Sequence, residues 1–513
     1  MAETKREVER KYEATGETRL PDLTRVPGVS AVVDRGVTEL DAVYYDTPDL
    51  RLAADALTLR RRTGGEDEGW HLKFPVASGI RDEIRAPLAD TLPGELAGLL
   101  RSRIRDAEVV PVVRLRSARD VRHLVDAKGR LLAELSVDTV RAERLPGGAE
   151  ATWTEIEVEL ADDADDADAA ILDAIEKRLG KAGIHASASA SKLARALADT
   201  APRSDRADTA PAPGPETAPG TAGHAVLVYV REQVDAIVAL DPAVRRDLPD
   251  AVHQLRVACR RLRSAFRSYR KVLDRDVTEP VGTELKWLAG ELGAARDQEV
   301  LTERLRGRID ALPRALRLGP VRGRLRSWAA VRARGGRRRT LAALESARYL
   351  ALLDTLDELL ADPPLRKAAA RDARAVLSRA VLKDHARLAA RVDRALALDP
   401  GQDRDLALHA ARKAAKRARY AAEAAAPALG KPARRVAKRV KSVQSLLGEH
   451  QDGVVAREAL RELATQAHAA GESAFTWGLL HGREEAEAAA GERDLPAAWA
   501  RAAAPEIRAA LTR

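Results

Sequence analysis

Residues 5–13 read KREVERKYE, and this short stretch decides how the first part of the chain folds. If the segment is a β-strand, successive side chains point to opposite faces. Glu7, Glu9 and Lys11 then share one face, and Val8 lies on the other. The stretch therefore predicts a strand with one apolar side and one side that carries two carboxylates beside an ammonium group.

The same alternation returns in later segments of residues 1–160, which are separated by turn signals such as Gly64-Gly65. The charged positions that share a face within a segment are Arg60 and Arg62; Lys73; Arg81, Glu83 and Arg85; Glu134 and Asp138; and Glu155, Glu157 and Glu159. For any single strand, a charged face in water is the simpler explanation. Repetition over several strands, with Glu and Arg concentrated on these faces, favours a closed sheet with the charges inside.

Charges inside a closed sheet are costly unless a ligand and a metal ion neutralise them. Carboxylate oxygens suit Mg²⁺ or Mn²⁺, and guanidinium groups suit phosphate. The pattern therefore indicates a tunnel that binds a divalent metal and a phosphate compound.

The chain divides into an acidic part and a basic part. Residues 1–200 carry 30 Lys and Arg against 38 Asp and Glu, a net charge of −8, and residues 201–513 carry 57 against 40, a net charge of +17. Residues 200–223 are rich in proline and lack large apolar side chains, which predicts a linker. We therefore expect one domain at 1–199 and a second at 224–513.

Helical periodicity is expected at residues 169–180 and 189–199 and from residue 224 onward, where strand signals are almost absent. The acidic run 162–168 is expected to be a solvated loop, with a metal buffer as the less favoured alternative.

The helical part contains a repeat. Segments that begin at His253 and His409 place basic residues at matching positions, and a Leu-Gly-x3-Asp pattern follows each, at Leu292 and Leu447. On a helix, at about 100° per residue, the basic residues of each copy fall within an arc of about 80°. The two stripes are His253, Arg256, Arg260 and Arg263, and His409, Arg412, Lys416 and Arg419, with Lys438 and Lys441 on a later helix.

A solvated basic face is the ordinary explanation of such a stripe. Most of these residues lack Glu partners at i,i+4, and the histidine recurs at the same place, so we favour a polyanion site. Aromatic residues make up only 3% of the chain, which argues against stacking on nucleic-acid bases.

Simple features exclude other classes of protein. Cys259 is the only cysteine, so neither an intrachain disulfide nor a Cys-based zinc cluster can form. No apolar run approaches the roughly 20 residues that span a bilayer, and the first residues lack the apolar core of a signal peptide. Walker A, GxGxxG and HExxH strings are absent. We expect a soluble, cytoplasmic protein.

The N-terminal segments resemble the CYTH, or triphosphate tunnel metalloenzyme, family over residues 5–199. The resemblance is carried by the ExExK stretch 7–11, YYDT at 44–47, LRRR at 59–62, WHLKFP at 70–75, the Ser-Ala-Arg that ends at Arg119, EIEVEL at 155–160 and Ser191-Lys192. It implies an eight-stranded antiparallel β-tunnel with flanking helices, and with it an α+β protein of two domains.

The resemblance also implies roles for single residues. It assigns catalysis to Glu7, Glu9 and Lys11; substrate binding to Lys11, Arg60, Arg62, Lys73, Arg119 and Lys192; and Mg²⁺ or Mn²⁺ binding to Glu7, Glu9, Asp138, Glu155, Glu157 and Glu159. Two points stay open at this stage. The pattern needs only two of the three late glutamates, and Arg114 and Arg116 compete with Arg119 for tunnel positions.

The helical segments resemble the CHAD family over about residues 224–510, through VHQLRVACRRLRSAFR and LHAARKAAKRARYAAE and the LGAARDQEV and LLGEHQD that follow them. This implies two pseudo-symmetric four-helix bundles that line a basic channel for inorganic polyphosphate. The expected partners are triphosphate and polyphosphate, with no specific nucleic acid and no membrane, and with polyphosphate granules as a further cellular site.

Together the two resemblances imply a metal-dependent enzyme that hydrolyses inorganic triphosphate or a related compound, joined to a polyphosphate-binding domain. One alternative is a non-catalytic protein that only binds polyphosphate or associates with its granules. Another is a different tunnel reaction, such as thiamine-triphosphate hydrolysis or adenylate cyclase chemistry.

Overall fold

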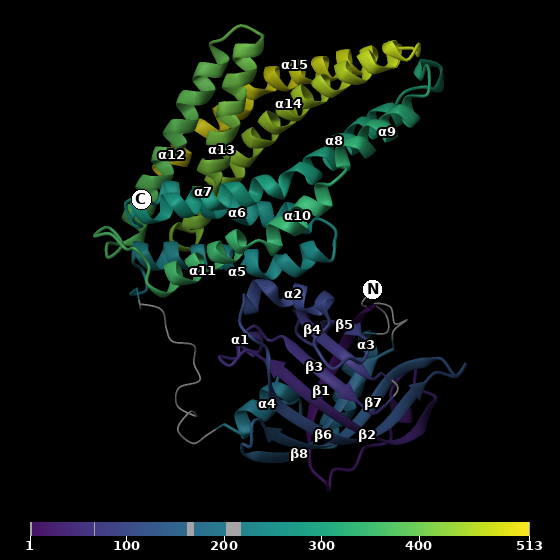
Figure 1. Ribbon diagram of the computed structural model, residues 1–513. Coiled ribbons are helices and arrows are strands. Elements are labelled where there is room, and N and C mark those ends of the chain that lie inside the picture. The colour runs from purple at the N-terminus through teal and green to yellow at the C-terminus, as the bar shows by residue number, and fades with distance from the viewer. Residues whose placement is uncertain (1–2, 66, 162–168, 202–216, 512–513) are drawn as a thin grey trace. The chain divides into compact units, whose positions relative to one another are not determined.

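The structure, a computed structural model, describes residues 3–65, 67–161, 169–201 and 217–511 (Figure 1). Contacts between residues divide the chain into two compact units, Met1–Ala212 and Pro213–Arg513. The acidic run 162–168 and the part of the expected linker at 202–216 lie outside the described residues.

Eight antiparallel strands of the first unit close into a barrel in the order β1-β5-β4-β3-β2-β6-β7-β8. The strands are β1 Glu3–Ala14, β2 Ala31–Asp46, β3 Thr58–Thr63, β4 Gly69–Ala77, β5 Ile80–Ala86, β6 Val110–Val125, β7 Leu131–Arg144 and β8 Glu150–Leu160. The eight-stranded antiparallel tunnel that the CYTH resemblance implies is therefore confirmed.

The apolar faces of the strands point outward, beneath helices, which leaves the charged faces to line the interior. Leu59 and Trp70 pack against Leu100 of α2, and Val158 packs against Leu179 of α3. The helices of this unit are η1 Leu23–Arg25, α1 Arg51–Ala54, α2 Gly94–Ile104, α3 Ala169–Lys181 and α4 Lys192–Asp199. Burial of the outer apolar face is thus what permits a polar interior.

Local capping fixes two of these helices. Asp46, at the end of β2, accepts hydrogen bonds from the backbone N–H groups of Leu52 at 2.8 Å and Ala53 at 2.9 Å and thereby holds α1. The helix expected at 189–199 begins only at Lys192, because the hydroxyl of Ser191 accepts the N–H of Ala194 at 3.0 Å and caps it. The strand pattern of residues 1–160 does not predict α2.

The second unit is helical. Its helices are α5 Ala222–Arg245, α6 Ala251–Ser268, α7 Arg275–Glu291, α8 Gly293–Asp310, η3 Arg314–Leu316, α9 Val321–Ala333, α10 Gly336–Glu345, α11 Ala347–Ala361, α12 Ala373–Leu396, α13 Gln402–Leu429, α14 Lys431–Ala469, α15 Phe475–Ala503 and α16 Pro505–Ala509. An α+β protein with a β-barrel followed by an all-helical part is therefore confirmed, and the pseudo-symmetry of two four-helix bundles stays a prediction.

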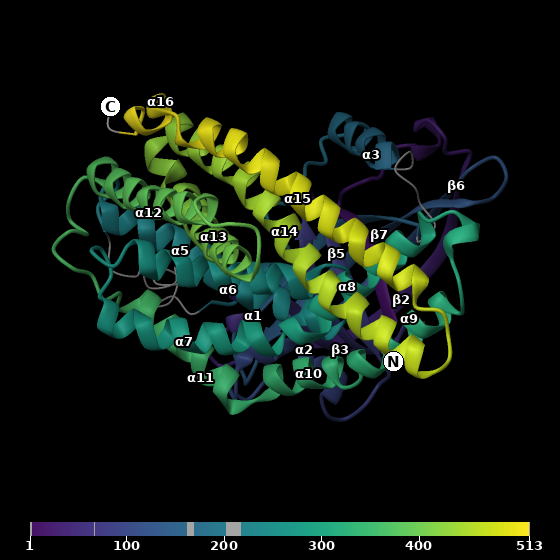
Figure 2. The ribbon, with the colours of Figure 1, turned by 90° about the horizontal axis from the view of Figure 1, so that it is seen from above.

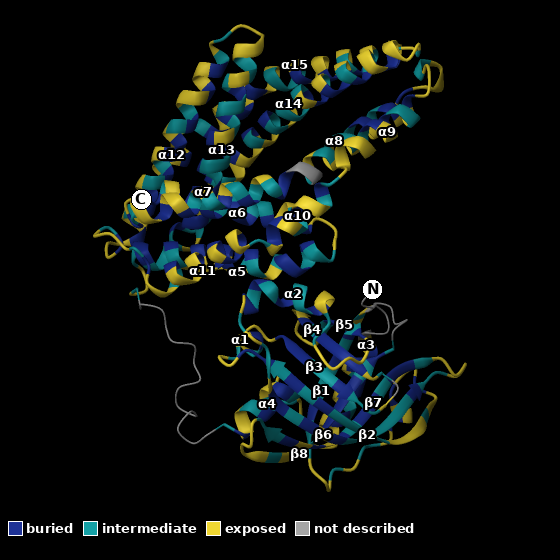
Figure 3. Cartoon of the chain, in the orientation of Figure 1, coloured by how far each residue is buried: buried dark blue, intermediate teal, exposed yellow. Residues whose placement is uncertain are grey.

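Two apolar cores hold the helical unit together. The larger core draws residues from α5–α7 and α11–α15, including Leu255 of α6 and Leu408 of α13. The smaller one joins α8 and α9 to the far parts of α14 and α15 through Leu305, Trp328 and Leu460. The long helices α14 and α15 lie side by side and take part in both cores (Figure 2). The inner faces of helices and the barrel strands carry most of the buried residues (Figure 3). No helix within the described ranges is long and apolar enough to cross a membrane.

Candidate active site

The barrel encloses a cavity of about 670 Å³, which we call the tunnel cavity. Ten of the twelve side chains that the sequence assigns to the tunnel line it: Glu7, Glu9, Lys11, Arg60, Arg62, Lys73, Arg119, Glu157, Glu159 and Lys192. The other two, Asp138 and Glu155, are buried in its wall and contact Lys192. Strand alternation, together with the first residue of α4, therefore brings the predicted residues together.

Three carboxylates from β7 and β8 converge at one point of the wall. Oxygen atoms of Asp138, Glu155 and Glu157 lie within 4.8 Å of one another, as the ligands of one metal ion would. The Nζ atom of Lys192 lies 2.9, 2.7 and 2.6 Å from them, so an ammonium group stands where a cation would bind. An all-oxygen donor set of this kind suits a hard divalent metal ion.

Arg119 and Lys11 complete this cluster. Arg119 donates two hydrogen bonds of 2.8 Å to Asp138 and one of 2.7 Å to Glu157, and Lys11 pairs with Glu157. Burial alone would raise the pKa of Glu157, but the charges of Lys11, Lys192 and Arg119 outweigh burial and hold that pKa well below its usual range. Glu157 is therefore ionised and ready to bind a cation.

The two early glutamates differ from each other. Burial raises the pKa of Glu7 to about 7, and although Lys73 Nζ lies 2.5 Å away and opposes the rise, Glu83 adds to it. The pKa of Glu9 is lowered, because Lys11 at 3.4 Å and other cations outweigh its burial. Among the described residues, neither glutamate belongs to the converging group of Asp138, Glu155 and Glu157.

The structure also bears on the two points that the sequence leaves open. Glu159 pairs with Lys5 at 2.8 Å and stands apart from the converging carboxylates. Arg114 and Arg116 pair with Asp41, at 2.5 and 3.7 Å, and neither lines the tunnel cavity. Arg119, an odd number of residues away, points to the opposite face of β6 and into the tunnel.

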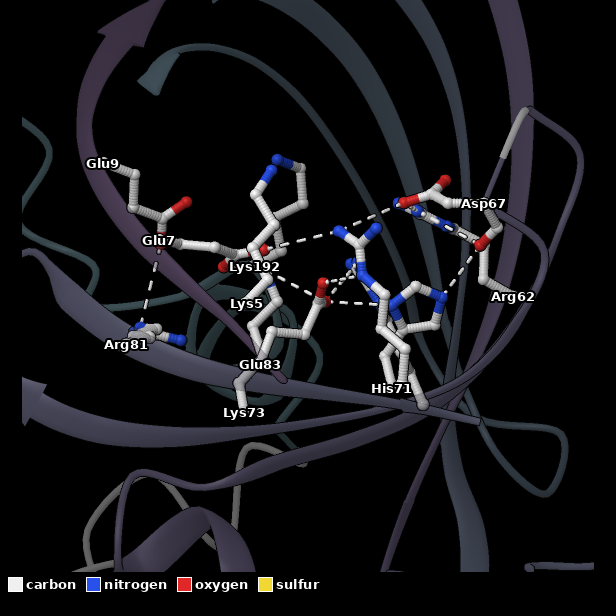
Figure 4. A network of polar contacts seen from close by, with 12 residues as sticks. Lys5, Glu7, Glu9, Arg62, Asp67, His71, Lys73, Arg81, Glu83 and Lys192 are labelled. Carbon is white, nitrogen blue, oxygen red and sulfur yellow. Dashed lines mark hydrogen bonds and ion pairs between the residues drawn. The ribbon is translucent and has the colours of Figure 1, made fainter. Parts of the chain in front are cut away.

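Sequence reasoning missed a second polar centre, built around Glu83. Glu83 is fully buried; its carboxylate accepts a 2.5 Å hydrogen bond from Arg85 Nε and lies 2.9 Å from His71 Nδ1 (Figure 4). Lys73 Nζ and Arg60 Nη2 each lie 3.5 Å from it. Glu83 thus holds together cations that line the tunnel. The shared face of Arg81, Glu83 and Arg85 was the available signal, but it did not reveal the partners on other strands.

In the helical unit, the two basic stripes lie on α6 and α13, which pack together. The hydroxyl of Tyr269 donates a 2.6 Å hydrogen bond to the carbonyl of Ala421 between them. Burial lowers the pKa of Lys416 on α13 to about 8, and the nearby positive charges of Arg412, on its own helix, and Arg260, on α6, contribute. The stripes therefore face one another closely enough to repel.

The repeat positions use matching contacts. Arg256 donates a 2.8 Å hydrogen bond to Asp297 of the first Leu-Gly-x3-Asp pattern, and Arg412 lies 3.6 Å from Asp452 of the second. In the second copy, His409 Nδ1 also lies 2.5 Å from the side-chain oxygen of Gln451.

Other stripe members differ in their degree of pairing. Arg419 pairs with Glu423 at 2.7 Å, and Lys438 and Lys441 are exposed on α14. The buried Nε atoms of Arg256, Arg260, Arg263 and Arg412 have no hydrogen-bond partner among the described residues. Each of these guanidinium groups therefore keeps a donor that the described residues do not use.

Comparisons with known proteins agree with this division. Residues 5–196 match the CYTH domain family and residues 228–461 match the CHAD domain family. The uncharacterized protein Rv2226 of Mycobacterium tuberculosis is 39% identical over 492 residues, which cover 93% of this chain and 92% of that protein.

Solved structures that resemble the chain include PptA from Streptomyces chartreusis, with 25% identity, a TM-score of 0.47 and coverage of 54% of this chain and 99% of that one. The CHAD domain from the plant Ricinus communis has 28% identity, a TM-score of 0.43 and coverage of 56% and 92%. The chain belongs to the proteins in which a CYTH domain is followed by a CHAD domain.

Proposed function

We propose that the tunnel is a metal-dependent hydrolase of inorganic triphosphate or a related triphosphate compound, and that the helical unit binds inorganic polyphosphate. The observation that carries the enzymatic part is the position of Lys192, whose ammonium group stands among three buried carboxylates. Carboxylates that can bind a metal ion and a lysine that can bind phosphate are therefore adjacent, as the binding of a metal–phosphate complex requires.

The proposed roles follow from these contacts. Asp138, Glu155 and Glu157 bind the metal, with Glu7, Glu9 and Glu159 available from β1 and β8. When bound, Mg²⁺ or Mn²⁺ supplies positive charge to the phosphate oxygens. Lys11, Arg60, Arg62, Lys73, Arg119 and Lys192 hold the substrate.

The chain's own part in catalysis is positioning and charge stabilisation. Buried cations fixed by Glu83 and by the late carboxylates need little reorganisation when negative charge develops on the transferred phosphoryl group. Carboxylates on the same wall, such as Glu9, can hold the attacking water. The substrate phosphates take the place of carboxylates that pair with these cations in the empty tunnel. The positive charges that bind the substrate are therefore already in position.

Phosphate release from inorganic triphosphate, thiamine triphosphate and ATP, each with Mg²⁺ and with Mn²⁺, tests the proposal. Glu9→Gln should lower the rate by roughly a hundredfold or more, as the loss of one transition-state stabiliser does elsewhere. Circular dichroism should show an intact fold. Unchanged turnover at saturating metal would remove Glu9 from the catalytic set.

The same assay separates the alternatives. Binding of triphosphate without phosphate release would favour a non-catalytic polyphosphate-binding protein. A clear preference for thiamine triphosphate, or formation of cyclic AMP from ATP, would favour the other tunnel reactions.

Polyphosphate binding by the helical unit is supported by the facing stripes of α6 and α13 and by the four buried arginine Nε atoms without a described partner. Labelled polyphosphate should be displaced by unlabelled polyphosphate far better than by single-stranded RNA or duplex DNA at equal phosphate concentration. Arg256→Ala and Arg412→Ala should each weaken binding, and together more than either alone. Equal competition by nucleic acid would reduce the stripes to a general basic surface.

The remaining parts of the proposal concern organisation. We take residues 1–199 as the tunnel domain, 200–223 as a linker and 224–513 as the helical domain. A cytoplasmic protein, associated with polyphosphate granules where these exist, is consistent with such ligands.

A further inference from the structure

The turn between β3 and β4 brings an acidic side chain to the cationic wall of the tunnel cavity. Asp67 lines the cavity; its carboxylate pairs with Arg62 and lies 3.6 Å from Arg85 Nη2 (Figure 4). Arg62 is one of the side chains proposed to bind phosphate. A carboxylate of the chain itself therefore holds a cation intended for substrate.

The described residues on either side of position 66 are held by close contacts. A Cβ atom on Gly64 would lie 2.3 Å from a backbone oxygen of β2, and one on Gly69 would lie 2.4 Å from a backbone oxygen of β5, so both glycines pack directly against neighbouring strands. The N–H of Gly64 donates a 2.7 Å hydrogen bond to Glu68, and His71 Nε2 lies 2.9 Å from the carbonyl oxygen of Asp67. The position of Asp67 is thus set by the fold.

The Asp67 side chain is nevertheless able to leave. It is 36% exposed, whereas the Arg62 side chain is only 7% exposed. Rotation of the carboxylate into solvent would hydrate it and leave the backbone contacts intact, so its main cost is the lost pairing with Arg62. Arg62 cannot follow, because it is enclosed by the barrel wall.

Arg62 needs an anion more than its neighbours do. Burial and the adjacent charge of Arg60 lower its pKa to about 10, and Arg119 adds to this effect, whereas Asp67 opposes it. Its Nε atom, like that of Arg60, is buried and has no hydrogen-bond partner among the described residues, so the difference between the two lies in the carboxylates that they contact. By contrast, Arg60 and Arg119 contact the fully buried carboxylates of Glu83 and Asp138.

We propose that Asp67 is an internal competitor for the phosphate site of Arg62 and Arg85: it occupies these cations in the empty tunnel and withdraws when a substrate phosphate arrives. The inference rests on the proposed function, because it concerns the affinity of the same tunnel. The Asp67 carboxylate pairs with Arg62 and Arg85, and within the described residues it forms no ion pair with Glu7, Glu9 or Lys11, to which catalysis is assigned. It therefore sets how strongly substrate must bind, without taking part in the chemical step.

Asp67→Asn tests this, with the full-length protein and steady-state hydrolysis of inorganic triphosphate, which reports on the tunnel alone. Removal of the competing charge should lower KM by about tenfold, equivalent to about 1.4 kcal/mol, and should lower the inhibition constant of pyrophosphate in the same direction. Most substitutions in a substrate tunnel raise KM, so the direction of the change is diagnostic. Asp67→Ser should give the same result.

Asp90→Asn is the matched control. Asp90 lies 3.7 Å from Arg61, the neighbour of Arg62 that points away from the tunnel, and is fully exposed. Asp90→Asn also removes one negative charge, but from the partner of Arg61, which lies next to Arg62 in β3 and on the opposite face. The KM of this variant should stay at the wild-type value.

The outcomes separate the two claims. If the wild type hydrolyses triphosphate but Asp67→Asn keeps or raises its KM, or if Asp90→Asn lowers KM equally, the competitor role is wrong while the proposed function stands. A lower melting temperature together with a raised KM would show instead that Asp67 stabilises the turn. If the wild type hydrolyses thiamine triphosphate or ATP instead, the same KM comparison is made with that substrate, and a wild-type protein that hydrolyses none of the three would overturn both.

Discussion

At the scale of single residues, the tunnel buries charged side chains that must be paired with an opposite charge. Lys192 contacts three buried carboxylates, and although burial alone would lower its pKa, these carboxylates raise it. Removing one partner from a buried ion cluster is costly, because the charges left behind are desolvated and unpaired. The stability of the protein should therefore depend both on Lys192 and on a metal ion that can bind the same carboxylates.

Lys192→Met should destabilise the metal-free protein by about 3 kcal/mol or more in urea unfolding, because it leaves the three carboxylates uncompensated. Millimolar Mg²⁺ or Mn²⁺ should restore much of the loss, because a cation that binds only the folded state stabilises it. Lys5→Met removes a less buried pair with Glu159 at 2.8 Å and should cost less than about 1 kcal/mol. Equal losses, or no rescue by either metal, would contradict the cation site.

Lys416 predicts the pH dependence of polyphosphate binding. Its pKa of about 8 reflects burial first and then the charges of Arg412 and Arg260, with Asp452 in partial opposition. The side chain is positively charged below this value and neutral above it, so affinity for polyphosphate should fall as pH rises from 7 to 9. Lys416→Arg should bind equally at both pH values in a fluorescence titration. If the affinity of the wild type for polyphosphate does not change through pH 8, Lys416 does not contact the ligand.

At the scale of elements, the two copies of the helical repeat are similar but unequal. A Cβ atom on Gly293, the first residue of α8, would lie 2.8 Å from the Arg256 guanidinium, whereas one on Gly448 of α14 would lie 3.7 Å from that of Arg412. Arg256 of α6 is thus packed tightly against α8, whereas Arg412 of α13 lies at an ordinary contact distance from α14.

Gly293→Ala should therefore displace Arg256 and weaken polyphosphate binding severalfold, although alanine itself favours a helix by about 1 kcal/mol. Gly448→Ala should leave affinity close to that of the wild type. Binding measured beside thermal unfolding separates displacement from loss of fold. Equal effects of the two changes would argue against unequal packing.

At the scale of the whole molecule, each unit has its own cores, and the net charges of the two parts of the chain have opposite signs. Cleavage near Pro213 should give two soluble, folded fragments, and the N-terminal one should keep hydrolysis of short substrates. Circular dichroism and phosphate release on the separated fragments would check this. An unfolded N-terminal fragment would place the domain boundary elsewhere.

The sequence alone determined the properties that depend on local periodicity. Alternation in KREVERKYE and its counterparts assigned the strands and the face that each charge occupies, and the 253 and 409 segments assigned the stripes on α6 and α13. Side-chain direction follows from backbone geometry within a few residues, so it can be read without knowledge of the fold.

Only the tertiary structure decided which charges meet. Closure of the barrel joins Lys192 to Asp138, Glu155 and Glu157, and brings His71 to Glu83 across neighbouring strands. It also sets Asp67 against Arg62, although the sequence gives no sign that a turn residue faces the cavity. Contacts of this kind depend on register and closure, which are set by the whole sheet and by the helices that bury its outer face.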